Sequence, residues 1–191
     1  MINKITSLIE EQIINLQYCL QELNNNELVK TIDIDDRHLD KSFRSAKLFS
    51  KSEDFKELYK SLCKDKPVLY WFTFDKDKFD KEKLEFDFES IKLDTKDRGL
   101  SFLPKIYHQG SSTLYVGKVK KNFHYRFVNH LGHSVNNKTT SLQLTYWYKA
   151  SKYGNLKLNY IVLDEGMQAL ISVLEVELAR ELKPIIGSHK N

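Results

Sequence analysis

The chain has 191 residues, of which 41% are hydrophobic and 29% charged, and this composition excludes a disordered or low-complexity protein. The formal net charge is +4, but residues 101–163 contain nine basic residues and no acidic one, a distribution that favours a nucleic-acid backbone as partner. There is no apolar run that could span a membrane and no secretory signal pattern, so we expect a cytoplasmic protein without a membrane partner.

The N-terminal region, residues 1–65, is predicted to be helical. Residues 2–23 form an amphipathic pattern with apolar residues four and three apart. These residues are Ile5, Ile9, Ile13, Leu16, Leu20 and Leu23. The stripe could dock on the rest of the chain or pair with a second copy or a partner protein. Docking is the favoured interpretation. A second helix is predicted over residues 52–63.

A second unit, residues 66–191, begins with an apolar run over residues 67–74, which predicts a strand buried on both faces. The charged stretch that follows alternates at 84–89 in a way typical of a half-exposed strand. Another strand is predicted at 113–119.

The C-terminal part of the chain predicts a helix at 123–131, strands at 141–148 and 158–163, and a long helix at 167–182 closed by Pro184 and Gly187. Trp147, on the first of these strands, is expected in the core. This order of elements indicates an α/β fold in which helices flank a small mixed or antiparallel sheet.

One set of residues in this second unit combines chemistry with a regular spacing. Tyr115-Val116-Gly117 is followed by Lys118, then by Arg126 eleven residues after Tyr115. His130 lies one turn after Arg126 on the same helical face. Glu175 precedes Pro184 by nine residues.

Together, in this order, these residues resemble the GIY-YIG nuclease family. The resemblance implies a metal-dependent endonuclease in which Tyr115, Arg126, His130 and Glu175 are catalytic, and Glu175 also binds the metal. Mg²⁺, or Mn²⁺ in its place, is the implied cofactor, since one carboxylate can hold a cation that keeps most of its waters. Glu177 is the rival to Glu175, but Glu175 lies nearer the buried stripe of its helix.

The first tyrosine of the family pattern is assigned to Tyr70, in Val68-Leu69-Tyr70. Here Val68 replaces the family's glycine, and 45 residues separate Tyr70 from Tyr115. We therefore expect an insertion at about 75–110, between the first two core strands. Tyr107 is the alternative, although its surroundings lack the apolar continuity of a central strand. Gly187 stands where many family members carry an asparagine.

The resemblance and the charge pattern predict hydrolysis of a nucleic-acid phosphodiester, with DNA the expected substrate and RNA still open. Arg126 would neutralise developing charge, and a tyrosine whose pKa is lowered by the nearby metal and Arg126 would orient or deprotonate the attacking water. His130 would share that work or contact a phosphate. Gly117 would allow close approach of the backbone, and Lys118, Lys120 and Lys121 would contact the nucleic acid. The alternatives are a catalytically silent nucleic-acid-binding module and a partner-interaction protein.

Overall fold

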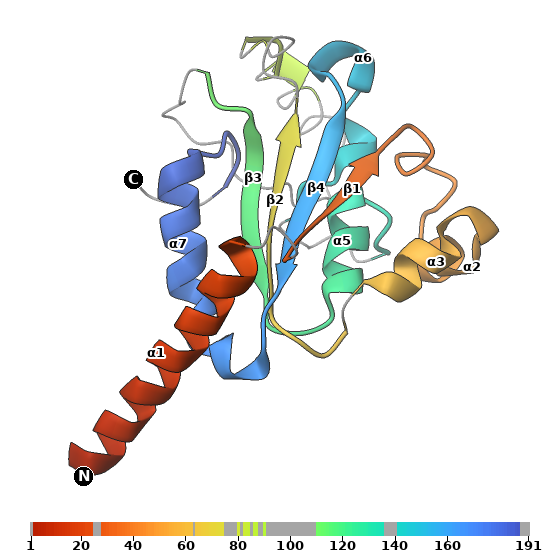
Figure 1. The fold of residues 1–191 in the computed structure, drawn as a ribbon. Coiled ribbons are helices and arrows are strands. Elements are labelled where there is room, and N and C mark those ends of the chain that lie inside the picture. Colours follow the sequence, from red (N-terminus) through yellow and green to blue (C-terminus); the bar gives the residue numbers. More distant parts are fainter. Residues whose placement is uncertain are drawn as a thin grey trace.

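The computed structural model describes residues 2–24, 28–62, 64–74, 80, 82–84, 86–87, 90, 110–135 and 141–187. Its centre is a four-stranded sheet in the order β1-β4-β2-β3, and every pair of neighbours is antiparallel (Figure 1). The chain is therefore a mixed α/β protein, as the order of its predicted elements indicated.

The strands are β1 (Val29–Ile34), β2 (Val68–Phe74), β3 (Thr113–Val119) and β4 (Leu156–Val162). The α-helices are α1 (Ile2–Asn24), α2 (Ala46–Lys51), α3 (Glu53–Ser61), α5 (Phe123–Leu131), α6 (Ala150–Tyr153) and α7 (Ile171–Leu182). Two 3₁₀ turns are η2 (Leu144–Tyr146) and η3 (Glu165–Gln168).

Three predicted strands and the central helix are confirmed. β2 occupies the middle of the sheet and pairs with β3 on one side and β4 on the other. Its burial explains why the sequence at 67–74 is apolar throughout, because side chains on both faces are covered. α5 follows β3 after a short turn and packs against the sheet face that carries the larger core.

The two faces of the sheet bury two separate cores. Val68, Tyr70 and Phe72 point into the larger one, which α2, α3 and α5 cover with Phe49, Phe55, Phe123 and Phe127. Leu69 and Ile161 point into the smaller one, which η3 and α7 cover with Met167 and Ile171. The side-chain alternation of a strand thus sends consecutive residues of β2 to different helices.

The N-terminal helix of the prediction is confirmed as α1, but its contact with the rest of the chain is narrow. It lies against η3, where Asn15 passes so close to Gly166 that an added Cβ would meet its Nδ2 at 2.6 Å. The remainder of the helix extends outward (Figure 1). Docking of the full apolar stripe is therefore not what the structure shows. Within the described residues, no helix is long and apolar enough to cross a membrane.

Two predictions of local structure were wrong. The described residues within 82–90 are helical and not a strand. Ser141–Tyr148 is also not a strand, because Gln143 adopts a left-handed backbone (φ 51°) and the chain turns into η2. Trp147 is nonetheless buried, and its indole N–H donates to the Leu142 carbonyl at 2.7 Å. The alternation of apolar residues at 141–148 therefore belongs to a turn and a 3₁₀ helix, and not to a strand.

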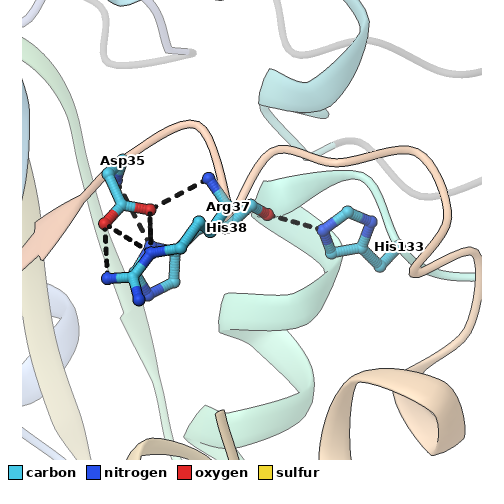
Figure 2. Close-up of polar contacts among 4 residues, drawn as sticks. All are labelled: Asp35, Arg37, His38 and His133. Carbon is cyan, nitrogen blue, oxygen red and sulfur yellow. Dashed lines mark hydrogen bonds and ion pairs between the residues drawn. The ribbon is translucent and has the colours of Figure 1, made fainter. Parts of the chain in front are cut away.

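The region expected to be only helical also contributes a strand. β1 pairs with β4 over six residues, and no strand was predicted there although four of the six residues are β-branched. After β1 the chain turns at Asp35, whose carboxylate accepts hydrogen bonds from the guanidinium of Arg37 (Figure 2). That guanidinium holds the pKa of Asp35 at about 2. His133, just beyond α5, donates from Nε2 to the His38 carbonyl at 2.7 Å. This bond ties the turn to the end of α5.

Candidate active site

Tyr70 and Tyr115 are brought together by the register of β2 and β3. Tyr70 lies opposite Gly117, and Phe72 lies opposite Tyr115, so both tyrosines project from the same face. Their ring centroids are 6.2 Å apart. A Cβ at position 117 would meet the Tyr70 Oη and the Tyr115 Cε1 at 2.6 Å each. Only glycine leaves room for both rings.

Arg126 joins the two phenols. It lies on the first turns of α5, where that helix crosses the tyrosine face of the sheet. Its Nε donates to Tyr70 Oη at 3.0 Å and its guanidinium also donates to Tyr115 Oη at 3.3 Å. The planar guanidinium can serve both oxygens at once because its donors are fixed in a fork.

His130 completes the cluster from one helical turn further along α5. It is fully buried, and its Nε2 lies 2.9 Å from Tyr70 Oη. The backbone N–H of Leu142 donates to its Nδ1 at 3.2 Å. Because Nδ1 accepts this bond, the neutral ring carries its hydrogen on Nε2 and donates to Tyr70. Tyr70 Oη thus accepts from two nitrogens and keeps its own hydrogen for a further acceptor.

Burial sets the charges of this cluster. It raises the pKa of Tyr70, and Tyr115 adds to the rise while Arg126 opposes it. Burial, together with the charge of Arg126, holds the pKa of His130 well below its usual value. For Arg126 burial acts downward, but the phenols of Tyr70 and Tyr115 outweigh it and raise its pKa. At neutral pH the cluster is therefore one cation among neutral rings. Without a metal the pKa of Tyr70 is thus raised, and the lowering expected from a metal together with Arg126 stays a prediction.

Glu175 reaches the site from α7. Its carboxylate lies 2.8 Å from the Nζ of Lys118, which also donates to Ser172 Oγ at 2.8 Å. The charge of Glu175 also adds to the raised pKa of Tyr70, after burial and Tyr115. Glu177, the rival, is largely exposed and pairs with Arg180 on the helix surface. Of these two glutamates, Glu175 is the one that pairs with a residue of the sheet, Lys118, on the face opposite the tyrosines.

The end of the chain fixes α7 on β3. Beyond α7, Ile185 and Ile186 donate from their backbone N–H groups to Thr113 and Leu114 at 3.0 and 2.9 Å. Ile186 also forms a parallel bridge with Tyr115. The segment after Pro184 is therefore a short extension of the sheet edge, and it sets the position of the helix that carries Glu175.

The basic residues predicted to contact a nucleic acid fall into two groups. Lys120 and Lys121 are exposed in the turn between β3 and α5, next to Arg126 in the chain. Lys118 is different, because the strand alternation turns it toward α7 and Glu175. Elsewhere in the acid-free stretch, Lys152 pairs with Asp87 at 3.0 Å and Lys157 with Asp33 at 3.8 Å. Acidic residues from earlier in the chain thus offset part of the basic excess.

Several partners in this site were not identified from the sequence. Ser172 and the Leu142 backbone carry no motif, and the Lys118–Glu175 pair joins residues 57 positions apart. The strand alternation at Gly117-Lys118 was the one available signal, because it places Lys118 on the face opposite Tyr115. Tyr107 and most of the predicted insertion at 75–110 lie outside the described residues.

Glu175 on α7 offers an oxygen donor of the kind that a hard cation of low protein coordination takes. Among the described residues there is no group of three or more His, Cys, Asp or Glu side chains that could hold a metal. Glu175 supplies one partly exposed carboxylate, with the hydroxyl of Ser172 near it through Lys118. A single carboxylate fits Mg²⁺, which retains most of its waters when bound, and does not fit a zinc cage.

Comparison of the chain with protein-family models, with curated proteins and with solved structures finds no match. The resemblance to the GIY-YIG nucleases therefore depends on the residues and contacts described above.

Proposed function

We propose that this chain is a metal-dependent endonuclease of the GIY-YIG type that hydrolyses phosphodiester bonds, with DNA as its substrate. The observation that carries this proposal is the hydrogen-bonded cluster of Tyr70, Tyr115, Arg126 and His130. Four residues that the family pattern names, from three separate elements, meet within hydrogen-bond distance. The proposed catalytic domain comprises residues 66–191 with an insertion at about 75–110, and β1, α2 and α3 of the N-terminal region 1–65 complete its sheet and its larger core.

Arg126 supplies the fixed cation of the proposed mechanism. Its raised pKa keeps it charged at every working pH. Two phenolic oxygens hold its guanidinium in place, so it needs no reorganisation when negative charge develops on the phosphoryl oxygens. Removing one such preorganised donor typically costs about 10²–10³-fold in rate.

Tyr70 and His130 would position the nucleophile. Because Tyr70 Oη already accepts from Arg126 and His130, its own hydrogen can go to a water or a phosphate oxygen. His130 holds the phenol in place through Nε2 and has no free lone pair, since Leu142 occupies Nδ1. In our proposal His130 therefore positions Tyr70, and Tyr70 orients the attacking water.

Glu175 would hold the metal. When bound, Mg²⁺ or Mn²⁺ would supply charge neutralisation and a water of lowered pKa. In the chain itself Lys118 satisfies this carboxylate at 2.8 Å and keeps it on the sheet side of α7.

The test compares two glutamates of the same helix. Plasmid DNA, single-stranded DNA and RNA are incubated with the protein in the presence of Mg²⁺, and also with EDTA. We expect cleavage that depends on the metal and that Glu175→Gln reduces by about 10²-fold or more. Glu177→Gln is the matched control and should cleave normally. Full activity of Glu175→Gln would remove Glu175 as the metal ligand, and no cleavage of any substrate would contradict the proposal.

A catalytically silent binding module is the second candidate, and the raised pKa of Tyr70 favours it over catalysis if no metal binds. It predicts wild-type binding to nucleic acid without cleavage under any metal condition. The same cleavage assay, together with a gel-shift measurement of nucleic-acid binding, distinguishes the endonuclease from the silent binding module.

A further inference from the structure

Helix α1 exposes more apolar surface than any other described element. Nine of its large apolar side chains, from Ile2 to Leu20, are between 40% and 79% exposed. Soluble proteins seldom leave a contiguous apolar surface of this size in water unless it binds something. A helix that is apolar on several sides is normally buried on several sides.

The exposed residues follow a heptad. Ile2, Ile9 and Leu16 are seven apart, and Ile13 and Leu20 occupy the second core position of the same repeat. Thr6 is the single polar residue in this seam up to Leu20. Alternating spacings of four and three are the pattern by which two helices supercoil around each other.

The seam carries no charge. The charged residues of α1 up to position 21 are Lys4, Glu10 and Glu11, and all three lie outside the two core positions. In a parallel pair, Glu10 would face Ile5 of the other copy and not another glutamate. Two copies of α1 can therefore meet along this seam without burying a charge or opposing like charges.

The seam also continues into an apolar groove of the same chain. Leu16 and Leu20 form one wall of this groove, and Leu69, Ile161, Met167 and Leu174 form the other. The groove has a volume of about 320 Å³. Each chain thus carries both an apolar helix and an apolar recess beside it.

We propose that α1 is a dimerisation helix, and that its occupant is α1 of a second copy, packed along the seam with its end over the groove. Such a contact is reciprocal, so it closes after two chains. The five apolar side chains of the seam and the flanking Ile5, each between 40% and 79% exposed, offer several hundred Å² per chain, and the groove beside Leu16 and Leu20 adds to this area toward the ~800 Å² that each partner contributes to a standard interface. The proposal does not depend on the nuclease function.

Sedimentation equilibrium of the full chain tests it. At about 50 μM, inside the range of ordinary specific interfaces, the wild type should have twice the chain mass of 22.5 kDa. The double variant Ile9→Glu/Ile13→Glu should be monomeric, because it places two charges in the seam on the part of α1 that is free of the sheet. Glu11→Lys, outside the seam, should remain dimeric.

Two results would overturn the proposal. A monomeric wild type would mean that another protein or an apolar ligand covers α1. A dimer that persists in the double variant would place the interface elsewhere. Ile9→Ser/Ile13→Ser, a milder change, and the thermal unfolding of each variant show that loss of the dimer is not loss of the fold.

Discussion

At the scale of single residues, Gly117 is the position where the candidate site has no room for a larger side chain. A Cβ there would lie 2.6 Å from the Tyr70 hydroxyl, and Tyr70 is buried, so its ring cannot simply swing into solvent. We expect Gly117→Ala to displace Tyr70 from Arg126 and to cost about 1–3 kcal/mol of unfolding free energy, as other overpacked cores do.

Two measurements test Gly117→Ala: the rate of DNA cleavage and the free energy of unfolding in urea. Cleavage should fall by about 10²-fold or more, since the phenol and guanidinium would lose their alignment. Gly110→Ala is a useful comparison, because nothing lies within 4 Å of a Cβ at that glycine, although its positive φ makes it strained too. Equal activity in Gly117→Ala and wild type would show that the Tyr70–Arg126 contact is not needed.

His130 gives a prediction about pH. Burial and Arg126 hold its pKa well below 6.5, so it stays neutral in the folded chain from pH 7.5 down to pH 6. The cleavage rate should therefore show no acidic limb near 6.5 that depends on His130. Unfolded histidine takes up a proton near pH 6.5. Stability contributed by the neutral His130 is thus complete above that pH and is lost as the pH falls below it.

The check combines a pH–rate profile with melting temperatures. His130→Gln keeps a donor and an acceptor but cannot titrate, so its melting temperature should fall less steeply than that of the wild type between pH 6.5 and 5. Its rate should be lower at all pH values by a similar factor. An acidic limb near 6.5 in the wild type that disappears in His130→Gln would make His130 the general base instead.

At the scale of the elements, sequence periodicity predicted those strands and the helix whose apolar pattern is local in the sequence. β2, β3 and α5 appear as expected because each buries a continuous apolar face. β1 was not predicted because it is short and mostly exposed, and its pairing with β4 spans more than 120 residues. The strand predicted at 141–148 failed because Gln143 turns the chain, and no glycine marked that turn.

In the candidate site, too, some features could be predicted from the sequence and others could not. Motif spacing predicted Tyr115, Arg126, His130 and Glu175, and the apolar strand pattern predicted Tyr70. The fold joins Tyr70, Tyr115, Arg126 and His130 by hydrogen bonds, whereas Glu175 pairs with Lys118 on the α7 side of β3. The contact of Leu142 with His130 depends on a turn that the sequence did not reveal. The complete burial of Tyr70, which raises its pKa in the absence of a metal, also could not be predicted at this level.

The turn between β3 and α5 carries the prediction about nucleic-acid binding. Lys120 and Lys121 are exposed, whereas Lys118 is engaged with Glu175. We expect Lys120→Ala/Lys121→Ala to reduce the slope of log K against log salt by about 2, one unit for each lost phosphate contact. Fluorescence anisotropy over a salt series, with EDTA present, measures this slope without cleavage.

The control for that turn is Lys149→Ala/Lys152→Ala, which removes the same charge on α6, where Lys152 already pairs with Asp87. Its slope should change by less than that of the Lys120/Lys121 variant. If both double variants change the slope equally, binding follows net charge and not this turn.

At the scale of the whole molecule, a dimer through α1 would give the proposed nuclease two sites in one particle. Two sites held together act at a high effective concentration on the same duplex. We therefore expect the wild type to convert supercoiled plasmid to linear product with little nicked circle. Ile9→Glu/Ile13→Glu should cut at each site normally but accumulate nicked circles several-fold, because the second cut requires a second encounter. Glu11→Lys should behave as the wild type. A time course of the three plasmid forms on agarose measures the ratio, and an unchanged ratio in the monomeric variant would mean that each chain cuts both strands alone.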